Sequence, residues 1–274
     1  MDDPQKPTET ERFAARRPQP VAPMGWDAPA NASERPEIAR EEVLRYLGHH
    51  GQDVEPELET RIAAAMARAR ETLRPRGVWA ILPVDATGTD ALGKPCIRLE
   101  GTTLELRGTD AFRHLKDARA AGIMAVTLGM PCERELRRLS MVDPLEATLF
   151  DAACSAYVEA AVDEVEARVR ACAARDGLVG NWRFSPGYGD CPLDTQPAFL
   201  ATLNAGRRIG LSATATNLLM PTKSVTAFLG LFDGEVRAAD SRPTCAGCAL
   251  GGACAFRAHG TFCYAGRLGK GAAG

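Results

Sequence analysis

The chain has 274 residues, which is enough to bury a substantial core in one large domain or two small ones. Its 33 basic and 35 acidic residues give a formal net charge of -2, so nothing favours nucleic acid or an anionic membrane as the main partner. No apolar run reaches the ~20 residues of a membrane span, and residues 1–4 lack the features of a signal peptide. We therefore expect a cytoplasmic protein.

Residues 1–35 are rich in proline and lack apolar periodicity, which predicts a disordered leader. Start and stop signals predict a helix from Pro36 to Gly48 and a second helix from Pro56 to Arg74. Strands are predicted over residues 78–84, 96–99 and 104–106, followed by a helix over residues 108–122. The compact apolar run 123–129 predicts a strand that is covered on both faces, as in the centre of a sheet.

Asp143 and Pro144 form an N-cap followed by a proline at the first helical position, and they begin the longest predicted helix. A further helix is predicted over residues 194–206 and a strand over residues 224–232. Because strands and helices alternate without a regular repeat, the sequence favours an α+β fold with one main domain over residues 36–239. A Cys-rich tail follows at residues 240–274.

A polar row lies beside the apolar stripe of the longest helix. Asp151, Ser155, Glu159 and Asp163 repeat at steps of four, so they share one helical face. Residue types alone favour a solvated face here.

Residues 183–192 form a turn-rich loop with two prolines and two glycines, whose main-chain groups are free to meet a ligand. Arg183 supplies a planar cation suited to a carboxylate, and Tyr188 supplies an aromatic face with a polar tip. The alternative is a surface turn with a solvated arginine and a tyrosine that covers the core. Residue types leave both interpretations open.

Four of the nine cysteines lie close together near the C-terminus, at Cys245, Cys248, Cys254 and Cys263. Four thiolates on a glycine-rich backbone can surround a zinc ion or an iron-sulfur cluster, although the spacing matches neither a paired zinc ribbon nor a ferredoxin. A redox thiol pair at Cys245 and Cys248, or a loose tail with reduced cysteines, are the alternatives.

The loop sequence Arg-x-x-Pro-Gly-Tyr, followed by Cys-Pro and a helix, resembles the S-adenosylmethionine-binding segment of the activation (reactivation) domain of cobalamin-dependent methionine synthase. Residues 42–48 and 127–129 are also similar to stand-alone proteins of that family, and the resemblance spans residues 37–232. It implies a twisted, mainly antiparallel sheet with flanking helices. It also implies S-adenosylmethionine contacts, which fall on Glu159, Arg183, Ser185, Gly187 and Tyr188.

The resemblance further implies reductive methylation of cobalamin. Since no homocysteine, folate or cobalamin module is recognisable, we expect the cobalamin to be carried by a partner, either a methionine synthase or another corrinoid methyltransferase. A flavodoxin- or ferredoxin-type protein is a candidate electron donor. Our hypothesis is that an iron-sulfur cluster in the tail relays the electron, with a structural zinc ion as the alternative. The sequence departs from the family at Gly189, where a proline is common.

Two other functions stay open. The chain could be a non-enzymatic, metal-carrying adaptor that docks on a corrinoid protein, or a relative of methionine synthase whose role is now only structural.

Overall fold

The structure is a computed structural model that describes residues 18–49 and 51–234. The predicted Cys-rich tail, with its four candidate metal ligands, and the first 17 residues of the predicted leader lie outside the described residues.

A seven-stranded antiparallel sheet forms the centre of the fold. Its strands are β1 (Val21–Asp27), β2 (Arg76–Asp85), β3 (Cys96–Leu99), β4 (Glu105–Arg107), β5 (Ala120–Thr127), β6 (Leu178–Gly180) and β9 (Ser224–Asp233). The order is β4-β3-β2-β5-β9-β6, and β1 also pairs with β2. All eight residues of β5 are buried between β2 and β9, as the apolar run predicted. The predicted α+β class with a mainly antiparallel sheet is confirmed.

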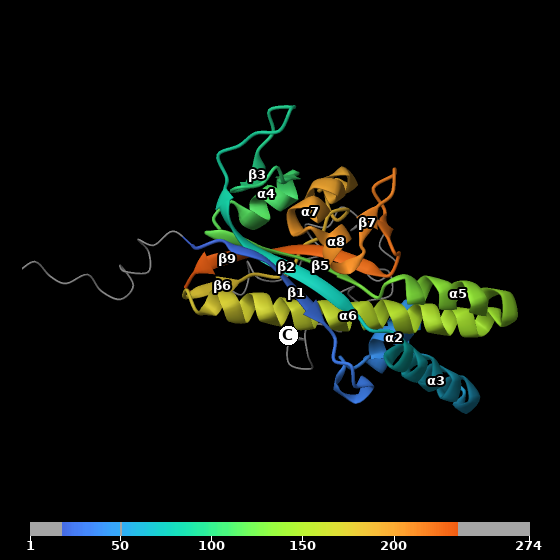
Figure 1. The fold of residues 1–274 in the computed structure, drawn as a ribbon. Helices are drawn as coiled ribbons and strands as arrows, with labels where there is room; N and C mark the ends of the chain where they lie inside the picture. Colours follow the sequence, from blue (N-terminus) through green and yellow to red (C-terminus); the bar gives the residue numbers. More distant parts are fainter. Residues whose placement is uncertain (1–17, 50, 235–274) are drawn as a thin grey trace, which may run out of the picture.

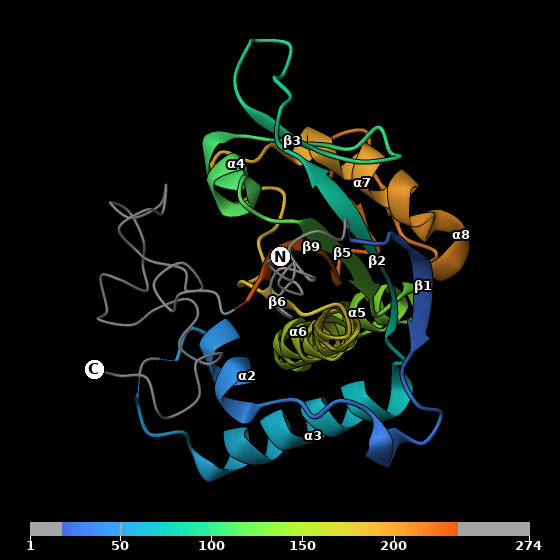
Figure 2. The same cartoon turned by 90° about the vertical axis from the view of Figure 1, so that its left-hand side faces the viewer.

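Helices cover both faces of the sheet (Figures 1 and 2). One face carries α2 (Arg40–Tyr46), α3 (Pro56–Thr72), α5 (Met130–Val142) and α6 (Pro144–Ala174). The other carries α4 (Thr109–Leu115), α7 (Gln196–Leu203) and α8 (Ala205–Ile209). Because side chains alternate along β5, Met124 and Val126 join the first apolar core, whereas Ile123 and Ala125 join the second.

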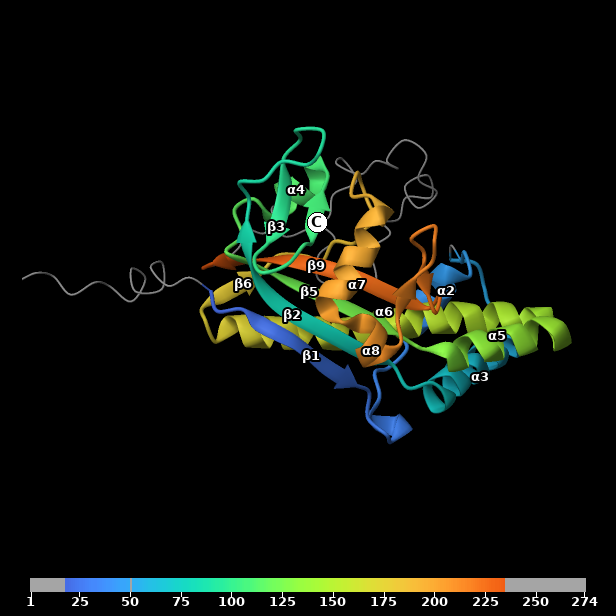
Figure 3. The same cartoon turned by 45° about the horizontal axis from the view of Figure 1, so that its top comes forward.

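The remaining elements are short. They are the single-turn helices η1 (Ala32–Glu34) and η2 (Leu193–Thr195) and the hairpin of β7 (Ser212–Ala213) and β8 (Leu219–Met220), which stands beside α7 in Figure 3.

The 31-residue helix α6 begins as predicted. The Asp143 carboxylate accepts hydrogen bonds from the amides of Leu145 (3.0 Å) and Glu146 (3.1 Å), and Pro144 is the first helical residue. The helix packs against β2, β5, β6 and β9, so residues on its edge lie close to the loops that join these strands. Among residues 18–49 and 51–234, no helix is long and apolar enough to cross a membrane.

The predicted leader is wrong for residues 18–35. Residues Val21–Asp27 form β1, which pairs with β2 and buries Trp26. Pro23 lies at an irregularity between Val21 and Met24 on this outer strand, a position where the missing amide of proline is tolerated. The prolines of this segment are therefore compatible with an outer strand of the sheet and did not indicate disorder.

Several helices also differ from the prediction. The helix expected over residues 108–122 stops at Leu115, because Ala120 and Ala121 lie in the central strand and packing overrides their helix propensity. The helix expected over residues 194–206 is divided at Asn204, which adopts a left-handed conformation. Helix α5 was not predicted.

Candidate functional site

Arg183 lies across one face of α6 and contacts three carboxylates there. Its Nη2 donates to Glu159 Oε2 (2.8 Å), and its Nη1 donates to Glu166 Oε2 (2.7 Å) and to Asp163. The side chain of Arg183 is only 8% exposed. The three acidic residues follow each other at steps of four and three, which places them on one face of the helix.

The electrostatics of this cluster favour the charged forms. Burial alone would lower the pKa of Arg183, but the charges of Asp163, Glu159 and Glu166 outweigh it and raise the pKa. Burial would likewise raise the pKa of Glu166, and the nearby charges of Arg183 and Arg170 lower it instead. The arginine and Glu166 are therefore both ionised at neutral pH.

A second arginine ties the same helix to the main chain that leads to Arg183. Arg170 donates from Nε to Glu166 Oε1 (2.8 Å) and from Nη1 to the carbonyl oxygen of Gly180 (2.7 Å), and it also contacts the carbonyl of Asn181. Glu166 thus uses one oxygen for each arginine. The chain is fixed on α6 just before the loop begins.

The remaining members of the polar row also have a cationic partner. Lys223, just before β9, lies 2.8 Å from Asp151 Oδ1 and donates to Ser155 Oγ (2.7 Å). The face of α6 that the residue types favoured as merely solvated therefore holds two cations, Lys223 at one end and Arg183 at the other.

The residues on either side of Arg183 point to the opposite face of the chain. Trp182 and Phe184 pack with His114 of α4, with ring centroids 4.6 Å and 5.6 Å from the imidazole. Burial lowers the pKa of His114 to about 4, so the ring is neutral at pH 7. The sequence analysis did not single out this cluster, although the alternation Trp-Arg-Phe is the signal that predicts it.

The loop after Arg183 starts from a firm anchor. Phe184 exchanges two main-chain hydrogen bonds with Phe228 of β9 (2.7 and 2.8 Å). Farther on, the amide of Gly187 donates to the Cys191 carbonyl (2.8 Å) and the amide of Tyr188 donates to the Ser185 carbonyl (3.1 Å). These amides are used inside the loop, which differs from the expectation that they would be free for a ligand. The Tyr188 side chain is 67% exposed.

The far end of the loop is held by the start of α4. The Asp190 carboxylate accepts from the amides of Thr109 (2.7 Å) and Asp110 (2.9 Å). Two glycines with positive φ permit this approach, because a Cβ on Gly108 would lie 2.7 Å from the Asp190 carbonyl oxygen and one on Gly189 would lie 2.3 Å from the Asp110 carboxylate. A side chain at position 189 would therefore clash with Asp110, so the close approach of the loop to α4 requires the glycine.

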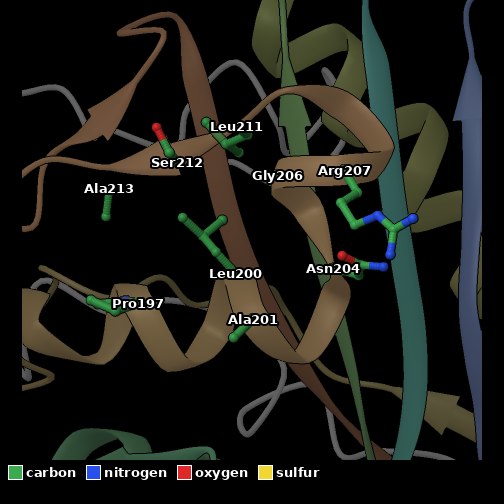
Figure 4. Close-up of a pocket in the computed structure, with 9 residues that line it drawn as sticks. All are labelled: Pro197, Leu200, Ala201, Asn204, Gly206, Arg207, Leu211, Ser212 and Ala213. Carbon is green, nitrogen blue, oxygen red and sulfur yellow. The ribbon is translucent and has the colours of Figure 1, made fainter.

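The structure thus brings Glu159 and Arg183 into direct contact and places Ser185, Gly187 and Tyr188 on the loop that follows. A shallow pocket of about 360 Å³ lies elsewhere, between α7, α8 and β7, and includes Leu200, Asn204 and Arg207 (Figure 4). It contains none of the predicted site residues. Within the described ranges, no group of three or more His, Cys, Asp or Glu side chains is arranged to hold a metal.

Comparisons with known proteins identify the fold. No protein-family model matches the sequence, and no curated protein does so either. Among solved structures, the crystal structure of the MetH reactivation domain bound to AdoHcy matches with a TM-score of 0.60 and 18% identity, over 86% of each chain. The fold of this chain is therefore that of the MetH reactivation domain, as the loop motif implied.

Proposed function

We propose that the chain binds S-adenosylmethionine at the surface formed by Glu159, Arg183, Ser185, Gly187 and Tyr188. The contact between Arg183 and Glu159 carries this proposal, because it pairs a cation and an anion at the start of the loop. The amino-acid end of S-adenosylmethionine carries one carboxylate and one ammonium group, which such a pair complements. The solved domain of the same fold is bound to AdoHcy, the demethylated form of this ligand.

The remaining residues give the ligand its orientation. The exposed ring of Tyr188 offers a flat face for an aromatic group, and the Ser185 hydroxyl lies three residues before it on the same loop. The amides of Gly187 and Tyr188 are used within the loop. We therefore expect the loop to bind the ligand through its side chains, which its fixed backbone holds in place. The loop is held at both ends, by Phe228 and by α4, so little ordering is required on binding.

The reaction that we propose is the reductive methylation of cobalamin on a separate corrinoid protein, such as a cobalamin-dependent methionine synthase. S-adenosylmethionine supplies the methyl group, and a low-potential protein donor supplies the electron. The chain itself positions the methyl donor, because proximity and orientation are what a binding surface contributes to such a transfer. His114 does not act as an acid, since it is neutral and packed among aromatic rings.

Calorimetric titration with S-adenosylmethionine tests the binding site. We expect wild-type protein to bind and the Arg183→Ala variant to lose ~1.5 to 3 kcal/mol of binding free energy, as for a hydrogen bond to a charged group. Arg207→Ala, at the pocket beside α8, is the matched control and should bind like wild type. Failure of the wild-type protein to bind would rule out the proposal.

The reaction itself is tested by cobalamin spectroscopy. The chain is mixed with a corrinoid methyltransferase, a reductant and S-adenosylmethionine, and the appearance of methylcobalamin is followed. Methylcobalamin should form in the presence of the chain and should form much more slowly with Arg183→Ala at the same S-adenosylmethionine concentration.

The tail supports a second proposal, that Cys245, Cys248, Cys254 and Cys263 hold an iron-sulfur cluster or a zinc ion. Their close spacing in the sequence is the observation that favours it. Iron, sulfide and zinc analysis of anaerobically purified protein distinguishes the two metals. A metal-carrying adaptor without methyl-transfer activity would hold metal but fail to bind S-adenosylmethionine.

A further inference from the structure

Arg183 already forms ion pairs with three carboxylates of the chain itself, and a ligand carboxylate has to compete with them. Its Nη1 is shared by Asp163 and Glu166, and its Nη2 is taken by Glu159. A ligand carboxylate that pairs with Arg183 therefore competes with these three carboxylates for the same cation.

The three carboxylates differ in what their release would cost. Glu159 and Glu166 are 18% and 14% exposed, so leaving either without its cation would strand a largely buried charge. Glu166 is also held by Arg170 through its other oxygen. Asp163 is 60% exposed, so water can solvate its carboxylate once it leaves the arginine.

Charge balance singles out the same residue. Within the cluster, Glu159 and Glu166 balance Arg183 and Arg170, and Asp163 adds one surplus negative charge. A ligand carboxylate that takes the place of Asp163 on Arg183 keeps the number of anions around this arginine unchanged. One that entered beside Asp163 would add a fourth anion to the group, which like-charge repulsion disfavours.

We propose that Asp163 is an internal competitor for the ligand carboxylate, which holds Arg183 until an amino-acid ligand displaces it. This inference rests on the proposed function, and it assigns a role in affinity to a residue that the loop motif does not include. Asp163 sets how tightly the site holds ligands that carry a carboxylate. It has no such effect on ligands that lack one.

Calorimetry with two ligands tests this role. S-adenosylmethionine carries the carboxylate, and decarboxylated S-adenosylmethionine lacks it but keeps the sulfonium and the amine. Asp163→Asn should bind S-adenosylmethionine about two- to five-fold more tightly, the scale of one exposed ion pair. The same variant should bind the decarboxylated ligand no more tightly than wild type does, because no competition is relieved and one attractive charge is lost.

Glu164→Gln is the matched control, since it removes the same charge from the next residue of α6, on an exposed position. It should leave the preference between the two ligands unchanged. If wild type binds S-adenosylmethionine but Asp163→Asn binds it equally or more weakly, the competitor role is overturned while the binding site stands. Tighter binding of both ligands to Asp163→Asn would also overturn it. Failure of wild type to bind would instead overturn the proposed function.

Discussion

The two ends of the loop that follows Arg183 are fixed by different physical means. At the α6 end, defined by Arg183 with Glu159, Asp163 and Glu166, side-chain ion pairs hold the chain, and Arg183 is almost fully buried. At the α4 end, defined by Tyr188, Gly189 and Asp190, a carboxylate accepts main-chain amides and the side chains are exposed.

This difference means that recognition is coupled to stability at the α6 end and much less so at the α4 end. Buried charges cannot lose a partner without a large cost, so the α6 end ties the loop position to the stability of the whole fold. The α4 end gains a smaller stabilisation from its capping interaction, and it leaves the Tyr188 ring exposed and available to a ligand. Substitutions of Arg183 should therefore lower stability as well as binding, whereas substitutions of the exposed Tyr188 should weaken binding with little effect on stability.

The largest effect is expected at the α6 end. Arg183→Ala leaves Glu159 and Glu166 without this cation, and we expect the free energy of unfolding to fall by about 2 to 4 kcal/mol. Chemical denaturation monitored by circular dichroism measures it. Arg183→Lys keeps the charge but not the planar fork, so it should recover only part of the loss. A loss of under ~0.5 kcal/mol would show that the cluster behaves as an ordinary surface network.

A smaller, pH-dependent effect is expected at the α4 end. Burial would raise the pKa of Asp190, but the amides of Asp110 and Thr109 outweigh it and lower the pKa. A carboxylate with a lowered folded-state pKa stabilises the protein above its unfolded pKa of about 3.9, and this contribution is lost as the pH falls through the folded value.

Asp190→Asn should therefore reduce the free energy of unfolding at pH 7 by about 1 kcal/mol, as for a weakened helix cap. The variant should also lose less stability than wild type when the pH falls below about 4. Denaturation curves at several pH values between 7 and 3 check both statements. An unchanged slope below pH 4 would mean that Asp190 does not titrate with folding.

The contrast between the two ends also explains how much of the site could be predicted. Arg183 and Tyr188 stand out in the sequence because their residue types and turn context are local features. The cluster around Arg183 could be predicted only in part. Periodicity placed Glu159 and Asp163 on one face of α6, but it gave no reason to add Glu166 or its second partner, Arg170. Which cation meets a row of acids depends on tertiary packing.

The fold shows the same division between local and long-range information. The cap at Asp143 and the apolar run of β5 were predicted correctly, since each depends on neighbouring residues alone. The pairing of β1 with β2 and the contact between Asp190 and α4 were missed, because they join residues that lie far apart in the sequence. The aromatic packing of Trp182 and Phe184 around His114 belongs to the second kind.

The smallest effect on stability, and therefore an effect on recognition that is not mixed with unfolding, is expected at Tyr188. Because its side chain is 67% exposed, Tyr188→Ala should change the free energy of unfolding by no more than about 0.5 kcal/mol. If the ring stacks on the ligand, the same change should weaken S-adenosylmethionine binding by about three- to ten-fold, the scale of one aromatic contact. Calorimetry and denaturation on the same preparation measure both quantities.

Tyr188→Phe decides which part of the side chain matters. Retention of wild-type affinity would assign the contact to the ring, whereas a loss equal to that of Tyr188→Ala would assign it to the hydroxyl. If Tyr188→Ala binds as well as wild type, recognition lies with the other site residues, Glu159, Arg183, Ser185 and Gly187. The α4 end would then only shape the loop, and recognition would depend on residues outside it.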